Sequence, residues 1–189
     1  MIISITGREG AGKTTVAKLL AEKLSYKNIY IGDLRRKAAA DRAMTLDEYN
    51  KLGLKDSSTD TQVDNYAKKI CEQEDNIVIQ GRTMWYFIPQ SFKVYLNVEP
   101  QEGARRVFQD LQKNSKQRNE TLYQNIEEAK QGLAKRATND KLRYKKHYGI
   151  ENVHDLKHFD LVIDTTNIPP DKVVEKILDS LPEDEIRKI

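Results

Sequence analysis

The sequence "MIISITGREGAGKTT" (residues 1–15) joins a short apolar run to a glycine-rich turn and the start of a predicted helix. The run at residues 1–6 is apolar and rich in β-branched side chains, which is typical of a strand buried on both faces. Beyond the turn, apolar residues recur at the spacing of one helical face, at Val16, Leu19, Leu20 and Leu24. The stretch therefore predicts a strand, a tight turn and a helix in direct succession.

The turn matches the pattern GxxxxGK[ST] in the context that this pattern requires, a strand before it and a helix after it. Glycines let successive backbone N–H groups point at one anion, and the helix N-terminus adds partial positive charge. Lys13 is placed to reach the β- and γ-phosphates of a nucleotide, and Thr14 to offer its hydroxyl to Mg²⁺. The predicted ATP-binding residues of the loop are Gly7, Arg8, Glu9, Gly10, Ala11, Gly12, Lys13, Thr14 and Thr15.

Length and composition predict one domain. The chain has 189 residues, and its 32 Lys and Arg residues are nearly balanced by 29 Asp and Glu residues. No long basic block indicates a nucleic-acid partner, and no apolar run approaches the roughly 20 residues that cross a bilayer. The one cysteine, Cys71, excludes an internal disulfide framework, and the N-terminus lacks a signal-type segment. We expect a cytoplasmic monomer that binds neither nucleic acid nor membrane.

Four further short apolar runs alternate with helical stretches and predict the rest of a buried parallel sheet. They are "NIYI" (28–31), "NIVIQ" (76–80), "KVYLN" (93–97) and "DLVID" (160–164). The long intervals 32–75 and 98–159 are helical and polar. We therefore expect them to form lobes above the strand ends, where they can act as moving parts.

Three sequence signals predict where helices begin. The spacing of a capping box occurs in "TLDE" (45–48) and in "TLYQ" (121–124). The prolines of "NIPP" (167–170) precede a last amphipathic helix. The charged tail at 182–189 is expected to fray.

A phosphate-binding turn serves switches, motors and kinases alike, so further residues must separate these classes. A GTPase needs a guanine-reading NKxD segment, which the chain lacks. In an ATPase motor this strand typically ends in an acidic residue, whereas here the predicted strand 76–80 ends at Gln80. Asp164 ends the last strand, either as a metal-linked carboxylate or as a strand-end cap. These features weaken the switch and motor interpretations.

Arginines follow the predicted strands and mark a second anion site. Arg36 follows the second strand and Arg82 the third, where ligands bind in open α/β sheets. Arg136, Asp140 and Arg143 are spaced by four and three residues, so they share one face of a predicted helix. Arg136 and Asp140 form either an ordinary surface ion pair or part of this site. Two facing phosphate sites indicate phosphoryl transfer between them.

The chain resembles the nucleoside monophosphate kinases of the P-loop class, and most closely the cytidylate kinases, including their archaeal-type branch. The similarity covers nearly the whole chain and rests on motifs in family order. These are "GREGAGKTTVAKLLAEKL", "IGDLRRKAA", "VIQGR", "VYLNVEP…ARR", the seven-residue spacing from Arg136 to Arg143 followed by "YKKHYGI", and "FDLVIDT".

The resemblance implies a three-layer P-loop α/β fold with a five-stranded parallel sheet in the order 2-3-1-4-5. Residues 1–32, 76–109 and 145–182 are expected to form the core of one domain. A monophosphate-binding lobe is expected near 33–75 and a lid near 110–144.

The resemblance also implies roles for individual residues on the acceptor and donor sides. Family arginines that match Arg36 and Arg82 grip the monophosphate, and Asp33 falls in the same Gly-Asp turn as an acidic residue of the family. The arginine that matches Arg106 approaches ATP.

The predicted lid carries the remaining implied site residues. Arginines that match Arg136 and Arg143 meet the phosphates from the lid, and the residue that matches Asp140 lies near the acceptor sugar or base. The residues to which we assign catalytic roles are Lys13, Arg82, Arg136 and Arg143.

Three departures from the family pattern bear on specificity. Arg8 and Glu9 replace small residues or proline inside the loop, and we interpret them as a solvated ion pair. Thr83 stands where bacterial cytidylate kinases have an aspartate that contacts cytosine. Trp85 is displaced by one position from the tryptophan of the archaeal pattern, and the aromatic cluster 85–87 packs either beside the acceptor base or in the core.

The sequence thus predicts an enzyme that uses ATP and Mg²⁺ to convert CMP or dCMP to CDP or dCDP. The alternatives are a P-loop kinase for another small acceptor, such as AMP, UMP or a metabolite, and a non-catalytic nucleotide-binding regulatory module. In the kinase, positioning and electrostatics are expected to supply the rate.

Overall fold

The computed structural model describes residues 1–118, 120 and 122–182. In this part of the chain, five parallel strands form one sheet in the order β2-β3-β1-β4-β5. The strands are β1 (Ile2–Gly7), β2 (Lys27–Tyr30), β3 (Ile77–Gln80), β4 (Phe92–Asn97) and β5 (Leu161–Asp164). The predicted strand order and the predicted P-loop α/β architecture are confirmed.

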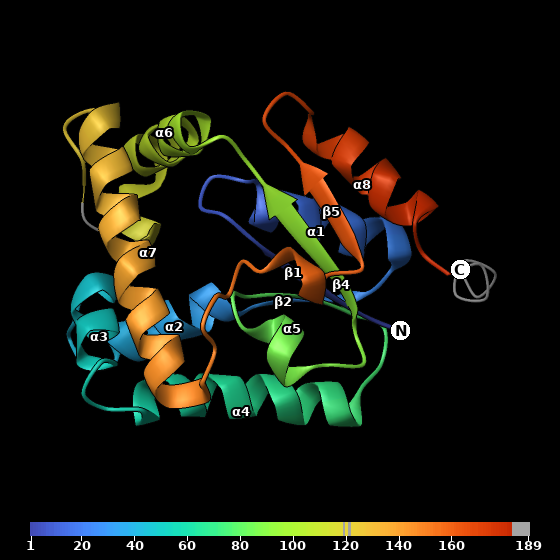
Figure 1. The fold of residues 1–189 in the computed structure, drawn as a ribbon, viewed down its shortest axis with the longest axis horizontal. Coiled ribbons are helices and arrows are strands. Elements are labelled where there is room, and N and C mark those ends of the chain that lie inside the picture. The colour runs from blue at the N-terminus through green and yellow to red at the C-terminus, as the bar shows by residue number, and fades with distance from the viewer. Residues whose placement is uncertain (119, 121, 183–189) are drawn as a thin grey trace.

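Helices fill the connections between the strands (Figure 1). They are α1 (Lys13–Leu24), α2 (Ile31–Ala40), α3 (Leu46–Leu52), α4 (Ser58–Gln73), α5 (Met84–Phe87), α6 (Pro100–Arg118), α7 (Ile126–Tyr148), the short 3₁₀ helix η1 (Leu156–His158) and α8 (Pro170–Asp179). None of the described helices is both long and apolar enough to cross a membrane.

The centre of the sheet is buried on both faces, because helices cover both. Every residue of β1 is buried, and Ile3 pairs with Val78 of β3 and with Phe92 of β4. The edge strands differ from the prediction of full burial: Val162 of β5 is 42% exposed, since an edge strand has a neighbour on one side only.

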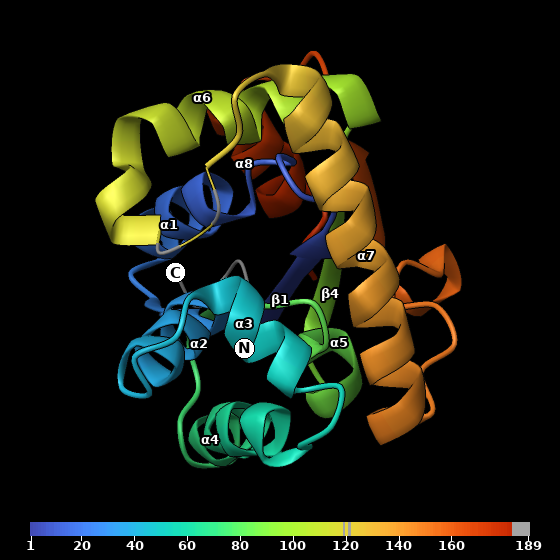
Figure 2. The same ribbon diagram turned by 90° about the vertical axis from the view of Figure 1, so that its left-hand side faces the viewer.

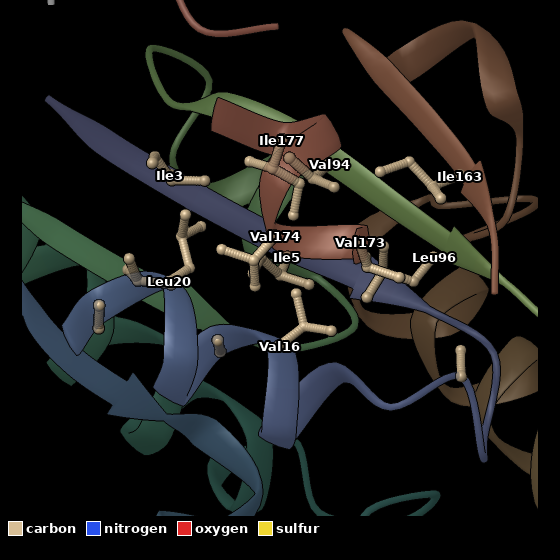
Figure 3. Packing of buried hydrophobic residues seen from close by; sticks show 14 of the residues in the cluster. Ile3, Ile5, Val16, Leu20, Val94, Leu96, Ile163, Val173, Val174 and Ile177 are labelled. Atoms are coloured by element: carbon tan, nitrogen blue, oxygen red, sulfur yellow. The ribbon is translucent and has the colours of Figure 1, made fainter. Parts of the chain in front are cut away.

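Two apolar clusters hold the helices against the sheet. On one face, α1 and α8 pack on the strands (Figure 3), with side chains that include Ile5, Val16, Leu20, Val94, Val173 and Ile177. On the other face, α4 contributes Val63, Ala67 and Cys71, and α5 with the residue after it contributes Met84 and Ile88. Cys71 is a buried, free thiol, as predicted. These clusters fix the strand ends that carry the site.

The helices α2, α3 and α4 lie at one side of the strand ends, and α6 lies at the other. Figure 2 shows α7 running from α6 past α3 toward α4. It packs along α6 and also contacts α3. Because α7 touches both groups of helices, its side chains can reach both sides of the space above the sheet.

Local boundaries follow the sequence signals in part. Thr45 forms the predicted capping box with Glu48. Ile31 begins α2 and does not end β2. The helix expected from "TLYQ" instead begins at Ile126, where the Asn125 side chain accepts from the backbone N–H of Glu128. Thr121 and the tail at 183–189 lie outside the described residues.

Candidate active site

The backbone of the loop between β1 and α1 requires its glycines. Gly10 and Gly12 have φ angles of 76° and 80°, in the left-handed region that glycine adopts without a side-chain clash. A Cβ on Gly7 would lie 2.1 Å from the carbonyl oxygen of Leu96, and one on Gly10 would lie 2.3 Å from that of Gly103. The loop therefore packs directly on β4 and α6, and Gly12 caps α1.

Lys13 and Thr14 are the first two residues of α1 and directly follow the loop. The Lys13 Nζ atom donates to the carbonyl oxygens of Gly7 at 2.9 Å and Arg8 at 2.5 Å. The Thr14 hydroxyl donates to Oε1 of Gln80 at 3.2 Å. An ammonium held over the loop and a hydroxyl beside it are the two side-chain groups that the GxxxxGK[ST] pattern brings to a nucleotide.

Thr14 and Gln80 fit a Mg²⁺ site in which water and phosphate oxygens supply most of the ligands. Both side chains line the same cavity, and each offers an oxygen atom, the kind of ligand that Mg²⁺ takes. Those residues contain no group of three or more His, Cys, Asp or Glu side chains arranged to hold a metal ion. Asp164 caps its strand end, where it accepts from the backbone N–H of Thr166 and from Nδ2 of Asn97.

A cavity of about 830 Å³ lies along the carboxyl ends of the strands and contains the loop. One end is lined by residues 165–170, and the other by side chains of α2 and α4. The predicted site residues that line it are Glu9, Gly10, Ala11, Gly12, Lys13, Thr14, Thr15, Asp33, Arg36, Arg82, Arg106 and Arg136. Those that do not are Gly7, Arg8, Asp140 and Arg143.

Arg106 of α6 ties the loop to the segment after β5. Its Nη2 donates to the carbonyl oxygens of Thr165 and Thr166 at 3.0 and 2.9 Å, and its Nη1 to that of Gly10 at 3.3 Å. Glu102 accepts from its Nε at 2.7 Å. The guanidinium therefore lies at the end of the cavity formed by the β1–α1 loop and the β5–α8 connection.

Arg82, just beyond β3, joins the β1–α1 loop to α7. Its Nη2 lies 2.6 Å from Oε1 of Glu9, and its Nη1 lies 2.9 Å from Oδ2 of Asp140. Its side chain is 18% exposed. The carboxylates of Glu9 and Asp140 thus hold the Arg82 guanidinium at the wall of the cavity.

The two charged residues inside the loop do not pair with each other. Arg8 donates from Nε to Oδ1 of Asn97 at 3.1 Å, whereas Glu9 pairs with Arg82. Burial alone would raise the pKa of Glu9, but the charges of Arg82 and Lys13 hold that pKa well below its usual range. The interpretation of Arg8 and Glu9 as a solvated ion pair is therefore wrong, because each side chain finds a partner on a different strand end.

Arg36 and Arg136 approach one carboxylate from two sides of the cavity. Arg36 Nη2 lies 2.6 Å from Oε1 of Glu120, and Arg136 Nη1 lies 3.0 Å from its Oε2. Arg36 also pairs with Asp33 at 3.1 Å and lies over the ring of Tyr30. The chain therefore brings a guanidinium from α2 and one from α7 to the same point.

Arg143 of α7 is buried and does not line the cavity. Its side chain is 1% exposed and pairs with Asp60 at 3.0 Å and with Asp140 at 2.9 Å. It also donates to the backbone carbonyl of Asn50 at 3.3 Å. The surface ion pair considered between Arg136 and Asp140 is not formed, because Asp140 turns toward Arg82 and Arg143.

The sequence analysis missed three polar residues that line the acceptor end of the cavity: Arg35, Asp60 and Asp64. Arg35 Nη1 pairs with Oδ1 of Asp60 at 2.5 Å. A signal was present in α4, because the two aspartates fall on the same helical face as its buried apolar residues, Val63, Ala67 and Cys71. Charge on the apolar face of an amphipathic helix indicates a function for that charge.

Asp64 is held by two hydroxyl groups. Tyr148 donates to its Oδ2 at 2.5 Å, and Thr83 donates to its Oδ1 at 3.4 Å. Burial raises the pKa of Asp64 to about 6. Asp64 as a whole is only 6% exposed, yet it lines the cavity.

The aromatic residues 85–87 differ in burial: Trp85 is buried, Phe87 is half-buried and Tyr86 is 44% exposed. Trp85 is 7% exposed and stacks on the ring of His158 at a centroid distance of 4.3 Å. It packs in a cluster with Tyr144, Ile150 and Val153. The structure thus favours the core interpretation for Trp85 but not for Tyr86.

The fold and the site define a P-loop phosphotransferase. Residues 3–132 match the family described as AAA domain. The cytidylate kinase of Methanocella arvoryzae is 35% identical over 166 residues, which is 88% of each chain. That of Archaeoglobus fulgidus is 32% identical over 190 residues, covering 100% of this chain and 97% of the relative. The chain belongs to the cytidylate kinase family.

Solved structures share the fold at lower sequence identity. A shikimate kinase from Bacteroides thetaiotaomicron superposes with a TM-score of 0.61 at 16% identity, covering 95% of this chain and 97% of that one. A shikimate kinase from Acinetobacter baumannii, in complex with shikimate, gives 0.59 at 19% identity over 94% and 90%. At these identities the likeness concerns the fold alone.

Proposed function

We propose that this enzyme transfers the γ-phosphoryl group of ATP to the phosphate of a nucleoside monophosphate, with CMP or dCMP as the preferred acceptor. The observation that carries the proposal is the cavity itself. It contains the phosphate-binding loop and, beyond it, the convergent guanidinium groups of Arg36, Arg82 and Arg136. A cation-rich pocket beside a nucleotide loop suits an acceptor that already carries a phosphate.

On the donor side, the loop amides and Lys13 bind the β- and γ-phosphates, and Thr14 is the protein ligand of Mg²⁺. Bound there, Mg²⁺ neutralises charge on the donor phosphates. Lys13 leaves the carbonyl oxygens of Gly7 and Arg8 when phosphate oxygens compete for it. Arg106 lies at the end of the cavity that takes the rest of ATP.

On the acceptor side, Arg36 and Arg82 hold the monophosphate and Arg136 closes over it from α7. An oxygen of the acceptor phosphate attacks the γ-phosphorus, the bond to the β,γ-bridging oxygen breaks, and ADP leaves. The arginines stabilise the charge that spreads over the transferred group. Residues 33–75 act as the monophosphate-binding lobe and residues 110–144 as the lid of a single domain.

In the proposed site, Asp140 and Arg143 lie behind the arginines that contact the phosphates. Asp140 holds the guanidinium of Arg82 at 2.9 Å and that of Arg143 at 2.9 Å. Because α7 carries Arg136 as well, closure of the helix moves the lid arginine and the support of Arg82 together. This coupling requires no contact between Arg143 and the phosphate.

A panel of acceptors tests the proposal. The enzyme is incubated with MgATP and, separately, CMP, dCMP, UMP, AMP and shikimate, and ADP formation is measured. We expect the highest kcat/KM with CMP or dCMP. A tenfold preference for AMP or for a non-nucleotide acceptor would remove the cytidylate assignment, and ATP binding without acceptor-dependent turnover would support a regulatory module instead.

A further inference from the structure

We infer that Asp64, together with Thr83, reads the amino group on the acceptor base and so separates cytosine from uracil. This inference rests on the proposed function and adds to it the residues that choose the base. The sequence motifs placed Asp140 near the acceptor sugar or base, but its carboxylate pairs with Arg82 and Arg143 and does not line the cavity.

Both residues lie where a base must go once the phosphate is held. Thr83 directly follows Arg82, and Asp64 faces it from α4; both line the cavity. Their residues are 4% and 6% exposed. A nucleotide whose phosphate binds at Arg36 and Arg82 has these two polar groups within the same cavity for its base.

The charges around this space leave Asp64 available to a ligand. Arg35 and Arg143 both pair with Asp60, one helical turn earlier on α4. Within the described residues, no arginine or lysine nitrogen lies within ion-pair distance of the Asp64 carboxylate. Its Oδ2 is fixed by Tyr148, whereas its Oδ1 has only the long contact of 3.4 Å from Thr83. Oδ1 is thus the acceptor with capacity to spare.

The donor and acceptor pattern of cytosine matches these two groups. Cytosine presents a 4-amino donor beside the N3 acceptor, whereas uracil presents the O4 acceptor beside an N3–H donor. Asp64 Oδ1 accepts from the 4-amino group, and the Thr83 hydroxyl rotates to donate to N3. With uracil, O4 would face the carboxylate with no hydrogen between them, which leaves two acceptors opposed.

The proposed contact with Asp64 recognises the amino group of the base and not the size of the base. Adenine also carries an amino group beside a ring-nitrogen acceptor, so Asp64 alone does not reject AMP. The discrimination assigned to Asp64 is therefore CMP against UMP.

The variant Asp64→Asn tests the inference, because it replaces an acceptor-only group by an amide of the same shape that can also donate to O4 of uracil. We measure kcat/KM for CMP and UMP at pH 7.5. The wild-type enzyme is expected to prefer CMP, and the ratio is expected to fall by about 10- to 100-fold in Asp64→Asn, as for loss of one hydrogen bond to a charged group.

The matched control is Asp60→Asn on the same helix. It weakens the ion pairs with Arg35 and Arg143, so it should lower kcat/KM for CMP and UMP together and leave their ratio within threefold. The second variant, Asp64→Ala, removes the carboxylate acceptor altogether and should lower the CMP:UMP ratio as well. It supplies the same test should Asp64→Asn fail to fold.

The outcomes separate the two levels of the proposal. A wild-type enzyme that phosphorylates no monophosphate ends the proposed function. A wild-type enzyme that phosphorylates CMP while both variants keep its CMP:UMP ratio within threefold leaves that function standing and overturns the role of Asp64. A wild-type preference for UMP over CMP also overturns it.

Discussion

Arg36 and Glu120 are 84 positions apart in the sequence and form a salt bridge of 2.6 Å in which both side chains are 9% exposed. Glu120 also pairs with Arg136, so its carboxylate lies between two arginines proposed to meet phosphates. A carboxylate and a phosphate present the same kind of oxygen pair to a guanidinium. Acceptor binding must therefore displace Glu120.

Replacing Glu120 by glutamine is expected to strengthen acceptor binding. A neutral amide competes less well for Arg36 and Arg136, so KM for CMP should fall by about three- to tenfold, as for weakening one charge-assisted hydrogen bond. The control is Glu72→Gln, which alters a carboxylate of α4 that is 59% exposed, pairs with Lys68 and does not line the cavity, so it should change KM by less than about twofold. A higher KM in Glu120→Gln would show instead that Glu120 orients the arginines for the acceptor.

Lys13→Ala is expected to lower kcat by about 100-fold or more, because it removes a preorganised positive charge from the transferred phosphoryl group. Steady-state rates with saturating MgATP and CMP measure the loss. Lys18→Ala serves as the control, since Lys18 lies on the same helix with its side chain 71% exposed. Activity of Lys13→Ala within threefold of the wild type would contradict the proposed role.

Arg136 and Arg143 are expected to respond differently to alanine substitution, although they share a helix. Arg136→Ala should lower kcat by at least about tenfold with a small change in stability, since Arg136 borders the cavity and the charge it meets grows in the transition state. Arg143→Ala should lower the free energy of unfolding by about 3 kcal/mol, because it removes a buried guanidinium that pairs with both Asp60 and Asp140. Each of these carboxylates keeps one other arginine partner, Arg35 and Arg82 respectively.

Thermal unfolding and kcat measured on both variants separate these effects, and a double-mutant cycle on kcat/KM adds the coupling between them. Strongly non-additive losses with intact stability would assign both arginines to one phosphate cluster. Near-wild-type activity in both Arg136→Ala and Arg143→Ala would contradict the proposed role of Arg136 as a lid arginine.

The raised pKa of Asp64 predicts how stability depends on pH. Burial and the neighbouring Asp60 raise that pKa from 3.8 to about 6, against the hydrogen bond from Tyr148 and the charges of Arg35 and Arg143. The folded protein therefore binds this proton more tightly than the unfolded chain, so ionisation of Asp64 costs stability as pH rises from about 4 to about 6. Below that window the cost is absent, and above it the cost is complete.

Asp64→Asn removes this titration. The difference in unfolding free energy between Asp64→Asn and the wild type should therefore shift in favour of the variant by about 2 kcal/mol between pH 4 and pH 7.5, at about 1.4 kcal/mol per pKa unit. Urea unfolding at the two pH values measures it. A pH-independent difference would show that Asp64 titrates as it does in the unfolded chain.

Local sequence was sufficient for the parts of the molecule whose physics is local. The succession of strands and helices along the chain follows from apolar runs and their period. The phosphate loop follows from glycines, whose backbone angles other residues rarely adopt. The GxxxxGK[ST] pattern places Lys13 and Thr14 because the loop and helix are continuous in the chain. Thr45 caps α3 for the same reason.

The tertiary structure alone decided which charges meet. Arg136 and Asp140 are neighbours on a helix, yet Arg136 pairs with Glu120 and Asp140 with Arg82. A buried charge must find a partner when it leaves water, and the partners come from whichever elements the sheet brings together. Spacing along one helix therefore identified the charged face of α7 but not its contacts.

The same reason explains why Asp64 was not found in the sequence. Its surroundings come from α4, from Thr83 after β3 and from Tyr148 at the end of α7, three segments joined only by packing. The sequence by itself determined the P-loop fold, the donor loop and the arginines at the strand ends, because each depends on contiguous residues. Burial and distant partners, which depend on how separate elements pack, decided which carboxylates enter the acceptor end and which arginine supports the site from below.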